Sequence, residues 1–367
     1  MKVGYDASTA RNIQGTGTYA SCLLEALSGK VEAVGFDYED FRKTMGFGVK
    51  IKKHLSRMAS RTSGDVYWEW NVVPELGAAA NIDLYHALGS CVPLSAPFKR
   101  VMTIHDLAFY YDPYYLTIPA QRFFTTFYKK SAESADMLIA ISESTKRDIL
   151  KHWDVAPEKI RVVHHAVGKE FFERKSASEV ESTMKKYRVP KDYYLFVGEL
   201  NHRKNLHTLV EAFAECDRSR SLVLCGQAQE GGYAQGLEET IRALGVRDRV
   251  VLTGRVSMDE LRCLYQGALA FVFPSLCEGF GLPILEAQAS QVPVVCADNS
   301  SMPEVAGDGA LLTPADDPEA LAEAMRVAVE ERRDALVTKG LENVKRFTWE
   351  RTADGTLSAY RHVLNIV

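Results

Sequence analysis

Short apolar runs alternate with longer amphipathic segments along nearly the whole chain. The first run, Lys2–Tyr5, is followed after a loop by a segment in which Tyr19, Leu23, Leu24 and Leu27 recur at the spacing of one helix face. Five further apolar runs in the first half each precede a loop or a helical pattern. They are Val31–Phe36, Ile82–His86, Arg100–Thr103, Met137–Ile141 and Arg161–Val163. Strands that alternate with helices are typical of a parallel sheet with crossover helices.

The same alternation restarts after a polar, charged stretch between Gly168 and Pro190. The second series predicts strands at Tyr193–Gly198, Ser221–Gly226, Val250–Thr253, Ala270–Phe273 and Val292–Cys296, and helices at Leu206–Cys216, Leu237–Leu244, Met258–Gln266 and Pro318–Glu330. Two such series favour two doubly wound α/β domains, which we place at 1–170 and 171–348. The last segment, Trp349–Val367, again has helical periodicity.

The composition adds limits on the class of protein. A chain of 367 residues favours two domains, and 46% hydrophobic with 25% charged residues is typical of a soluble globular protein. The net charge of −4 disfavours a nucleic-acid binder, which needs a basic surface. The seven cysteines form no C-x-x-C pair, so we interpret them as buried free thiols. Without a signal-peptide pattern or an apolar run of ~20 residues, we predict a cytoplasmic protein.

The stretch Ala270–Glu286 carries the strongest candidate chemistry. It predicts a buried strand, a turn containing two glycines, and a helix from about Leu282. Free backbone N–H groups and the positive end of the helix dipole converge at such a helix start and favour an anion or a polar ligand. Glu278 and Glu286 bracket the turn. Because carboxylates would repel a phosphate, we interpret both as acceptors for hydroxyl groups.

Other candidate groups also follow predicted strand ends, where ligands of open α/β sheets bind. Arg203 and Lys204 can neutralise a diphosphate, or else belong to a solvated basic turn. His105, followed by Asp106, can contact a substrate hydroxyl, or else be a structural histidine beside a capping aspartate. Gly15 to Gly17, placed before the first helix, lets backbone N–H groups approach a phosphate. We interpret the adjacent pair His164 and His165 as structural.

Two features point to surfaces rather than to a reaction. Residues 41–61 contain seven Lys and Arg, with Phe47, Ile51, Leu55 and Met58 on one helical stripe. Such a helix can lie on an anionic membrane or pack its stripe on the sheet, and both remain open. The aromatic groups in 109–115 and 123–128 fit an acceptor groove or core packing. No D-x-D, H-E-x-x-H or His/Cys ligand spacing indicates a metal site.

Several of these segments together resemble the glycosyltransferase family 4 group of GT-B enzymes. The most specific is FPSLCEGFGLPILEA, which matches the family's E-x7-E motif, and VGELNHRKN, TIHDLAF, AISESTKRDI and SSMPEVAGDGALL occur in the family's order. The sequence looks most like bacterial mannosyltransferases of O-antigen or capsule assembly. The resemblance implies a GT-B fold, in which two Rossmann-like domains face each other across a cleft and the last helix, 349–367, packs back on the first domain.

The resemblance also implies a retaining hexosyl transfer from a nucleotide-sugar, without a metal or another cofactor. By position, the residues expected at the reaction are His105, Arg203, Lys204 and Glu278. Those expected to bind the donor are Gly15, Gly17, Arg255, Val256, Gly279, Phe280, Gly281, Leu282 and Glu286. Glu199 departs from the family pattern, since many members place an arginine there, so Arg203 and Lys204 alone supply the basic pair.

The resemblance leads to a specific functional expectation. We expect an α-mannosyltransferase that uses GDP-mannose, acts on a polyprenyl-diphosphate-linked saccharide and binds peripherally to the inner face of the plasma membrane. The same fold and chemistry with a UDP-sugar or GDP-fucose donor is an alternative. A catalytically silent partner that binds nucleotide-sugars is another, from a different functional class. No nucleic-acid partner is expected.

Overall fold

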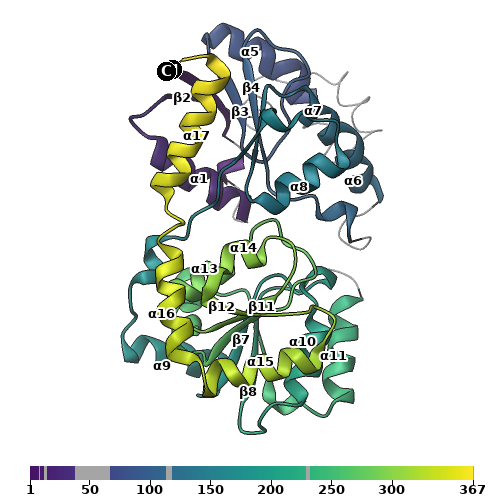
Figure 1. Cartoon of the computed structure of the whole chain (residues 1–367), viewed down its shortest axis with the longest axis vertical. Helices are drawn as coiled ribbons and strands as arrows, with labels where there is room; N and C mark the ends of the chain where they lie inside the picture. The colour runs from purple at the N-terminus through teal and green to yellow at the C-terminus, as the bar shows by residue number, and fades with distance from the viewer. Residues whose placement is uncertain (8, 12–14, 38–66, 113–117, 229–231, 367) are drawn as a thin grey trace, which may run out of the picture. The chain divides into compact units, whose positions relative to one another are not determined.

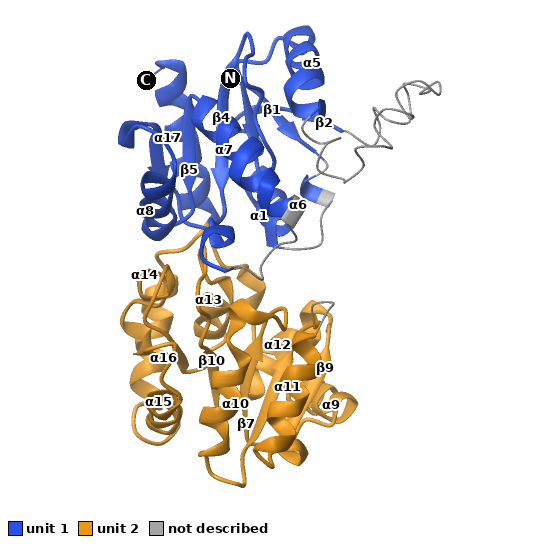
Figure 2. Cartoon of the chain, turned by 90° about the vertical axis from the view of Figure 1, so that its right-hand side faces the viewer, with its two compact units in different colours: residues 1–165, 349–367 blue, residues 166–348 orange. Residues whose placement is uncertain are grey.

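The computed structural model describes residues 1–7, 9–11, 15–37, 67–112, 118–228 and 232–366 (Figure 1). The predicted basic helix at 41–61 lies outside the described residues, as does the end of the aromatic segment 109–115. The chain divides into two compact units, one formed by 1–165 with 349–367 and the other by 166–348 (Figure 2). The sequence had placed this division at 170/171, in the same connecting region.

The first unit is built on a six-stranded parallel sheet with the order β2-β1-β3-β4-β5-β6. Its strands are β1 (Lys2–Asp6), β2 (Glu32–Phe36), β3 (Leu84–Ala87), β4 (Lys99–Ile104), β5 (Met137–Ala140) and β6 (Ile160–Val162). Its helices are α1 (Gly15–Leu27), α5 (Val73–Ala80), α6 (Ile118–Phe123), α7 (Lys129–Ser134), α8 (Glu143–His152) and α17 (Trp349–Leu364).

Two hydrophobic clusters cover the two faces of this sheet. One contains Val73 of α5, Ala132 of α7 and Ile149 of α8. The other contains Leu23 of α1 and Leu357 of α17, together with further apolar residues of these two helices. Alternate side chains of a strand point to opposite faces, and the central strand β4 accordingly contributes Met102 and Ile104 to the first cluster and Val101 to the second. The first unit therefore has helices on both faces, with the start and the end of the chain packed on the same one.

The second unit repeats the architecture with the strand order β12-β11-β10-β7-β8-β9, again all parallel. Its strands are β7 (Tyr193–Val197), β8 (Ser221–Cys225), β9 (Val250–Gly254), β10 (Ala270–Phe273), β11 (Val294–Ala297) and β12 (Ala310–Thr313). Its helices are α9 (Ala177–Tyr187), α10 (Leu206–Ala214), α11 (Tyr233–Ala243), α12 (Met258–Gly267), α13 (Leu282–Ala289), α14 (Met302–Ala306), α15 (Pro318–Glu330) and α16 (Arg333–Val344). The prediction of two doubly wound parallel sheets is thus confirmed.

Three local details differ from the sequence prediction. Gly15 to Gly17 is the first turn of α1 and not a loop before it, because the entropic cost of glycine in a helix is small and burial of Gly17, Tyr19 and Ala20 along α1 outweighs it. Asn205 stands at the start of α10, a position where an asparagine in the sequence predicts a capping side chain, but it does not cap this helix. Its backbone is left-handed (φ 56°), and its side chain donates to the carbonyls of Pro274 (3.1 Å) and Ala315 (2.6 Å). The edge strand β12 was not predicted.

Glycines allow two neighbouring strand ends to approach closely in the second unit. Gly198 follows β7 with φ 152°, and Gly226 follows β8 with φ 155°. The Gly198 amide donates to the Cys225 carbonyl at 3.0 Å. A Cβ added to Gly226 would lie only 1.8 Å from the Gly198 carbonyl oxygen. Only glycine fits at position 226, and the close approach fixes where the loop after β7 begins.

We expect Gly226→Ala to lower the free energy of unfolding by about 3 kcal/mol or more, because the new methyl group meets backbone that cannot rotate away. Gly245→Ala is the matched control, since Gly245 also has a positive φ (68°) but open space around it. Its cost should be about 1 kcal/mol, that of a left-handed alanine. Urea unfolding measures both. Equal losses would contradict the close-approach explanation.

Candidate functional site

Three loops meet at the carboxyl ends of the adjacent strands β11, β10 and β7. The central loop, after β10, carries Glu278. From the β7 side, Arg203 Nη1 donates to the Cys277 carbonyl at 2.8 Å. From the β11 side, Ser300 Oγ accepts from the Glu278 amide at 3.0 Å, and Ser301 Oγ donates to the Glu278 carbonyl at 2.9 Å. Both neighbouring loops therefore hold the backbone of the Glu278 loop in place.

The Glu278 side chain joins two basic groups. Arg203 Nη1 lies 2.6 Å from Glu278 Oε2, and Lys204 Nζ lies 2.5 Å from Oε1. The Lys204 ammonium also sits 4.8 Å from the centre of the Phe273 ring, within cation–π range. The Asn201 side chain accepts from the Lys204 amide at 3.3 Å and so caps the short turn that carries the basic pair.

The charge of this ion cluster (Arg203, Lys204 and Glu278) is well defined near neutral pH. Burial raises the pKa of Glu278, but the charges of Arg203 and Lys204 outweigh it and bring the pKa to about 2. Two cations and one anion leave one net positive charge. The cluster can therefore attract a phosphate group even though it contains a carboxylate.

The turn after Glu278 presents mainly backbone. The Phe280 ring is buried and packs edge-on against Phe347 at 5.8 Å, so only the main chain of Phe280 is available to a ligand. Gly281 adopts a left-handed conformation (φ 99°) just before α13, and Leu282 is the first residue of that helix. With Gly279, these residues bring the N–H groups of the turn and the helix start together, as predicted for a polar ligand.

Glu286 lies one turn into α13 in a different electrostatic environment. It accepts a 2.8 Å hydrogen bond from the Tyr265 hydroxyl of α12. Burial raises the pKa of Glu286 to about 7, the Tyr265 hydrogen bond lowers it, and the negative charge of Glu170 raises it. Glu278 is thus ionised throughout the physiological range, whereas Glu286 titrates within it.

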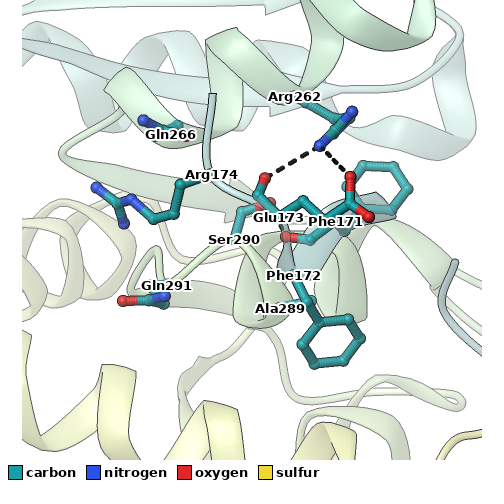
Figure 3. A pocket seen from close by; sticks show the side chains of 9 residues that line it. All are labelled: Phe171, Phe172, Glu173, Arg174, Arg262, Gln266, Ala289, Ser290 and Gln291. Carbon is teal, nitrogen blue, oxygen red and sulfur yellow. Dashed lines mark hydrogen bonds and ion pairs between the residues drawn. The ribbon is translucent and has the colours of Figure 1, made fainter. Parts of the chain in front are cut away.

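The remaining donor-side candidates occupy the loop between β9 and α12. Arg255 is exposed and Val256 is partly buried. The unit also has a pocket along 171–174 and helices α12 and α13 (Figure 3). There Arg262 Nη2 contacts Glu173 Oε2 at 3.3 Å. The pocket contains none of the predicted site residues, and its ion pair holds the segment that follows Glu170.

The other candidates belong to the first unit. His105 follows β4 and donates from Nε2 to the Leu88 carbonyl at 2.7 Å. Burial lowers the pKa of His105, while the Leu88 carbonyl and Asp106 raise it. Gly15 is exposed and Gly17 is buried in the first turn of α1.

The structure therefore brings Arg203, Lys204 and Glu278 into direct contact. Sequence reasoning missed the partners of Glu286, because Tyr265 reads as one more apolar position of a helix and Glu170 as part of a charged linker. Within the described residues, no three or more His, Cys, Asp or Glu side chains gather as a metal site would require. None of the helices in those same ranges combines the length and the apolar character needed to cross a membrane.

Comparisons with known proteins divide the chain at the same region. The family model described as Glycosyltransferase Family 4 matches residues 13–171, and the model described as Glycosyl transferases group 1 matches residues 179–343. The O-antigen chain mannosyltransferase B of Escherichia coli is 29% identical over 72% of this chain and 70% of its own length. The O-antigen chain mannosyltransferase RfbU of Salmonella typhimurium is 29% identical over 82% and 81%.

A solved structure supports the same fold. Alr3699/HepE of Anabaena, crystallised with UDP and glucose, superposes with a TM-score of 0.74 at 18% identity and covers 98% of both chains. At this identity the likeness concerns the fold alone.

We expect Glu278→Gln to destabilise the protein by about 3 kcal/mol, because Arg203 and Lys204 stay buried and charged while the carboxylate that pairs with both of them is lost. Urea unfolding measures the loss. Glu330→Gln is the control. Glu330 pairs with Arg220 at a half-exposed position, so its substitution should cost under about 1 kcal/mol.

The pKa of Glu278 lies below its ordinary 4.5. The stability that the ionised Glu278 carboxylate contributes to the folded state is therefore present above pH 4.5 and lost as the pH falls toward 2.

The family resemblance implies that Glu286 binds the ribose of a nucleotide; if it does so in GDP, the affinity for GDP should rise as the pH increases through about 7. The pKa of Glu286 is about 7, and an ionised carboxylate accepts hydrogen bonds from two ribose hydroxyls. If only the ionised form binds, the apparent affinity grows about tenfold between pH 6 and pH 8. Titration calorimetry across that range measures it. Stability should change in the opposite direction, because the folded state holds this proton more tightly.

Two variants separate Glu286 from the titration of the phosphates themselves. Glu286→Gln should leave only the phosphate contribution to the pH profile. Tyr265→Phe removes the hydrogen bond that lowers the pKa of Glu286, so the rise in affinity should move to higher pH. A Glu286→Gln profile identical to that of the unmodified protein would rule out a ribose contact by Glu286.

Proposed function

Since this chain belongs to the glycosyltransferases, with a Family 4 region followed by a group 1 region, we propose that it transfers mannose from GDP-mannose with retention of configuration. The acceptor is a hydroxyl of a growing, lipid-linked cell-surface saccharide. The mannose assignment rests on relatives named as O-antigen mannosyltransferases, whose similarity extends over most of the chain. The ion cluster of Arg203, Lys204 and Glu278 is the observation that carries the proposed chemistry.

Arg203 and Lys204 form the diphosphate site in this proposal. A guanidinium offers two parallel donors to phosphate oxygens, and a neighbouring ammonium adds a point charge. Both would stabilise the GDP leaving group, whose negative charge grows as the bond to the sugar breaks. Because these residues supply the compensating charge, the proposed reaction needs no metal ion.

Glu278 and Glu286 bind two different parts of the donor. A carboxylate has about four lone-pair positions, and Arg203 and Lys204 each take one on Glu278. The remaining positions can accept from hydroxyls of the sugar. Glu286, eight residues farther along, accepts from the ribose hydroxyls. Arg255 and Val256 flank the base, and the glycine turn of α1 approaches the phosphates.

The proposed bond changes occur on one face of the sugar. The bond from the anomeric carbon to the diphosphate oxygen breaks, and a bond to the acceptor oxygen forms on the same side. The acceptor proton passes to the departing diphosphate. His105 contacts a sugar hydroxyl. Its Nε2 hydrogen is committed to the Leu88 carbonyl, so in the neutral ring Nδ1 acts as the hydrogen-bond acceptor.

A lipid-linked acceptor would place the enzyme at the cytoplasmic face of the plasma membrane. The first unit carries exposed aromatic side chains suited to such a surface, at Tyr67, Tyr111 and Phe127. The basic segment 41–61 would add attraction to anionic lipids.

A panel of nucleotides and nucleotide-sugars tests the donor. Saturating GDP should raise the unfolding temperature by roughly 5 °C or more, and GDP-mannose should be turned over. Activity should be unchanged in excess chelator. Arg203→Ala should lower kcat/KM by roughly 100-fold or more, as expected for removing a group that stabilises the leaving charge.

Three results would redirect the proposal. Stabilisation by UDP without GDP would replace the donor with a UDP-sugar, and turnover of GDP-fucose alone would replace the sugar. Binding of GDP-mannose without turnover on any saccharide acceptor would favour a catalytically silent binding partner. Loss of activity in chelator would overturn the metal-free mechanism.

A further inference from the structure

Two aromatic rings pack against the ring of the candidate residue His105. The Tyr19 ring of α1 contacts His105 edge-on, with ring centres 5.1 Å apart, and stacks on His165 at 4.4 Å with an interplanar angle of 13°. The His105 and His165 rings also meet edge-on at 5.3 Å. Tyr19 is 1% exposed and His165 is 4% exposed. The two rings therefore form a rigid wall against the imidazole of His105.

The Tyr19 and His165 rings restrict rotation of the His105 ring about its Cβ–Cγ bond. The Leu88 carbonyl can only accept a hydrogen bond, so His105 Nε2 carries the hydrogen, at 2.7 Å. A flip of the His105 ring about its Cβ–Cγ bond would replace Nε2 by Cε1 at the Leu88 carbonyl and Nδ1 by Cδ2 on the other edge, and the packing of Tyr19 and His165 against the imidazole opposes that rotation. The rings therefore keep Nε2 on Leu88 and leave Nδ1 on the opposite side.

Tyr19 is itself held by a directional chain of hydrogen bonds. At its far end Tyr360 donates to the Tyr5 hydroxyl (3.3 Å), so His86 Nδ1 must donate to Tyr360 (2.6 Å). His86 Nε2 is then an acceptor for the Thr103 hydroxyl (2.8 Å), and Thr103 accepts from Tyr19 (3.1 Å). Burial brings the pKa of His86 to about 3, which keeps that ring neutral and the direction of the chain fixed.

Tyr19 also contacts the two residues at which the chain leaves and re-enters the first unit. His165 is the last residue of the first unit before the second unit begins, and Trp349 is the first residue after the second unit ends. The Trp349 ring lies 6.3 Å from the Tyr19 ring.

We propose that Tyr19 and His165 are positioning residues, which hold the His105 ring with Nδ1 presented as an acceptor to a substrate hydroxyl. This inference rests on the proposed function, in which His105 contacts the sugar. It assigns a role to His165, which the sequence had suggested only as a structural residue. Both residues act through His105 and neither needs to touch the substrate.

Paired substitutions test the role of the rings. Tyr19→Leu and His165→Ala each remove one ring, and we expect kcat to fall 10- to 100-fold while KM for the donor stays within threefold. Tyr19→Phe and His165→Phe keep a ring in place and should recover most of that loss. The nitrogen chemical shifts of His105, assigned with His105→Gln, should report one tautomer in the unmodified protein and in the phenylalanine variants. They should report a mixture of tautomers in the ring-deletion variants.

Leu27→Ala is the stability control, because Leu27 is buried on the same face of α1 but lies about two helical turns beyond Tyr19. If Tyr19→Leu loses no more kcat than Leu27→Ala at a matched drop in unfolding temperature, the positioning role is refuted. If Tyr19→Leu does not fold, the His165 pair decides by the same criteria. A fully active His105→Gln would overturn the sugar contact, while the tautomer shifts would still decide whether the rings position His105.

Discussion

The charge balance at Glu278 is the constraint on which the candidate site depends. Removing a carboxylate, a guanidinium or an ammonium from water costs several kcal/mol, and the opposite charges of these three side chains offset much of that cost for one another. Their attraction ties the loops after β7 and β10 together, while the serines after β11 hold the Glu278 backbone. Taken together, the three side chains carry one net positive charge, which favours an anionic ligand. Organisation of the loops and attraction of phosphate thus come from the same three side chains.

The first unit instead uses a network of neutral groups to orient the rings next to His105. The hydroxyls of Tyr5, Tyr19 and Tyr360 are connected through Thr103 and His86, and burial keeps the imidazole uncharged. Such a network orients rings without binding an anion. The two units therefore contribute differently to the proposed reaction, the second by charge on the donor and the first by the orientation of a hydrogen-bond acceptor.

Much of the fold could be predicted because apolar runs and helical stripes recur where the elements lie. The strand β12 could not, since three of its four residues are incompletely buried and its pattern is that of an edge. Arg203 and Lys204 were predictable as a basic pair after a strand end, but not their contact with Glu278, about seventy-five positions away. The raised pKa of Glu286 could not be predicted from the sequence either, because it depends on packing between α12 and α13.

The position of α17 has a consequence for synthesis of the protein. Its residues complete a core that begins with β1 and α1, yet they leave the ribosome after the whole second unit. At typical translation rates this delay is roughly 10 to 40 s. During that time α1 can cover its own part of this sheet face, but the part that will receive Leu357 and Tyr360 stays uncovered, so the first unit is completed only after the second has been made. A nascent chain of this kind would expose a binding surface for chaperones until α17 has left the ribosome and packed.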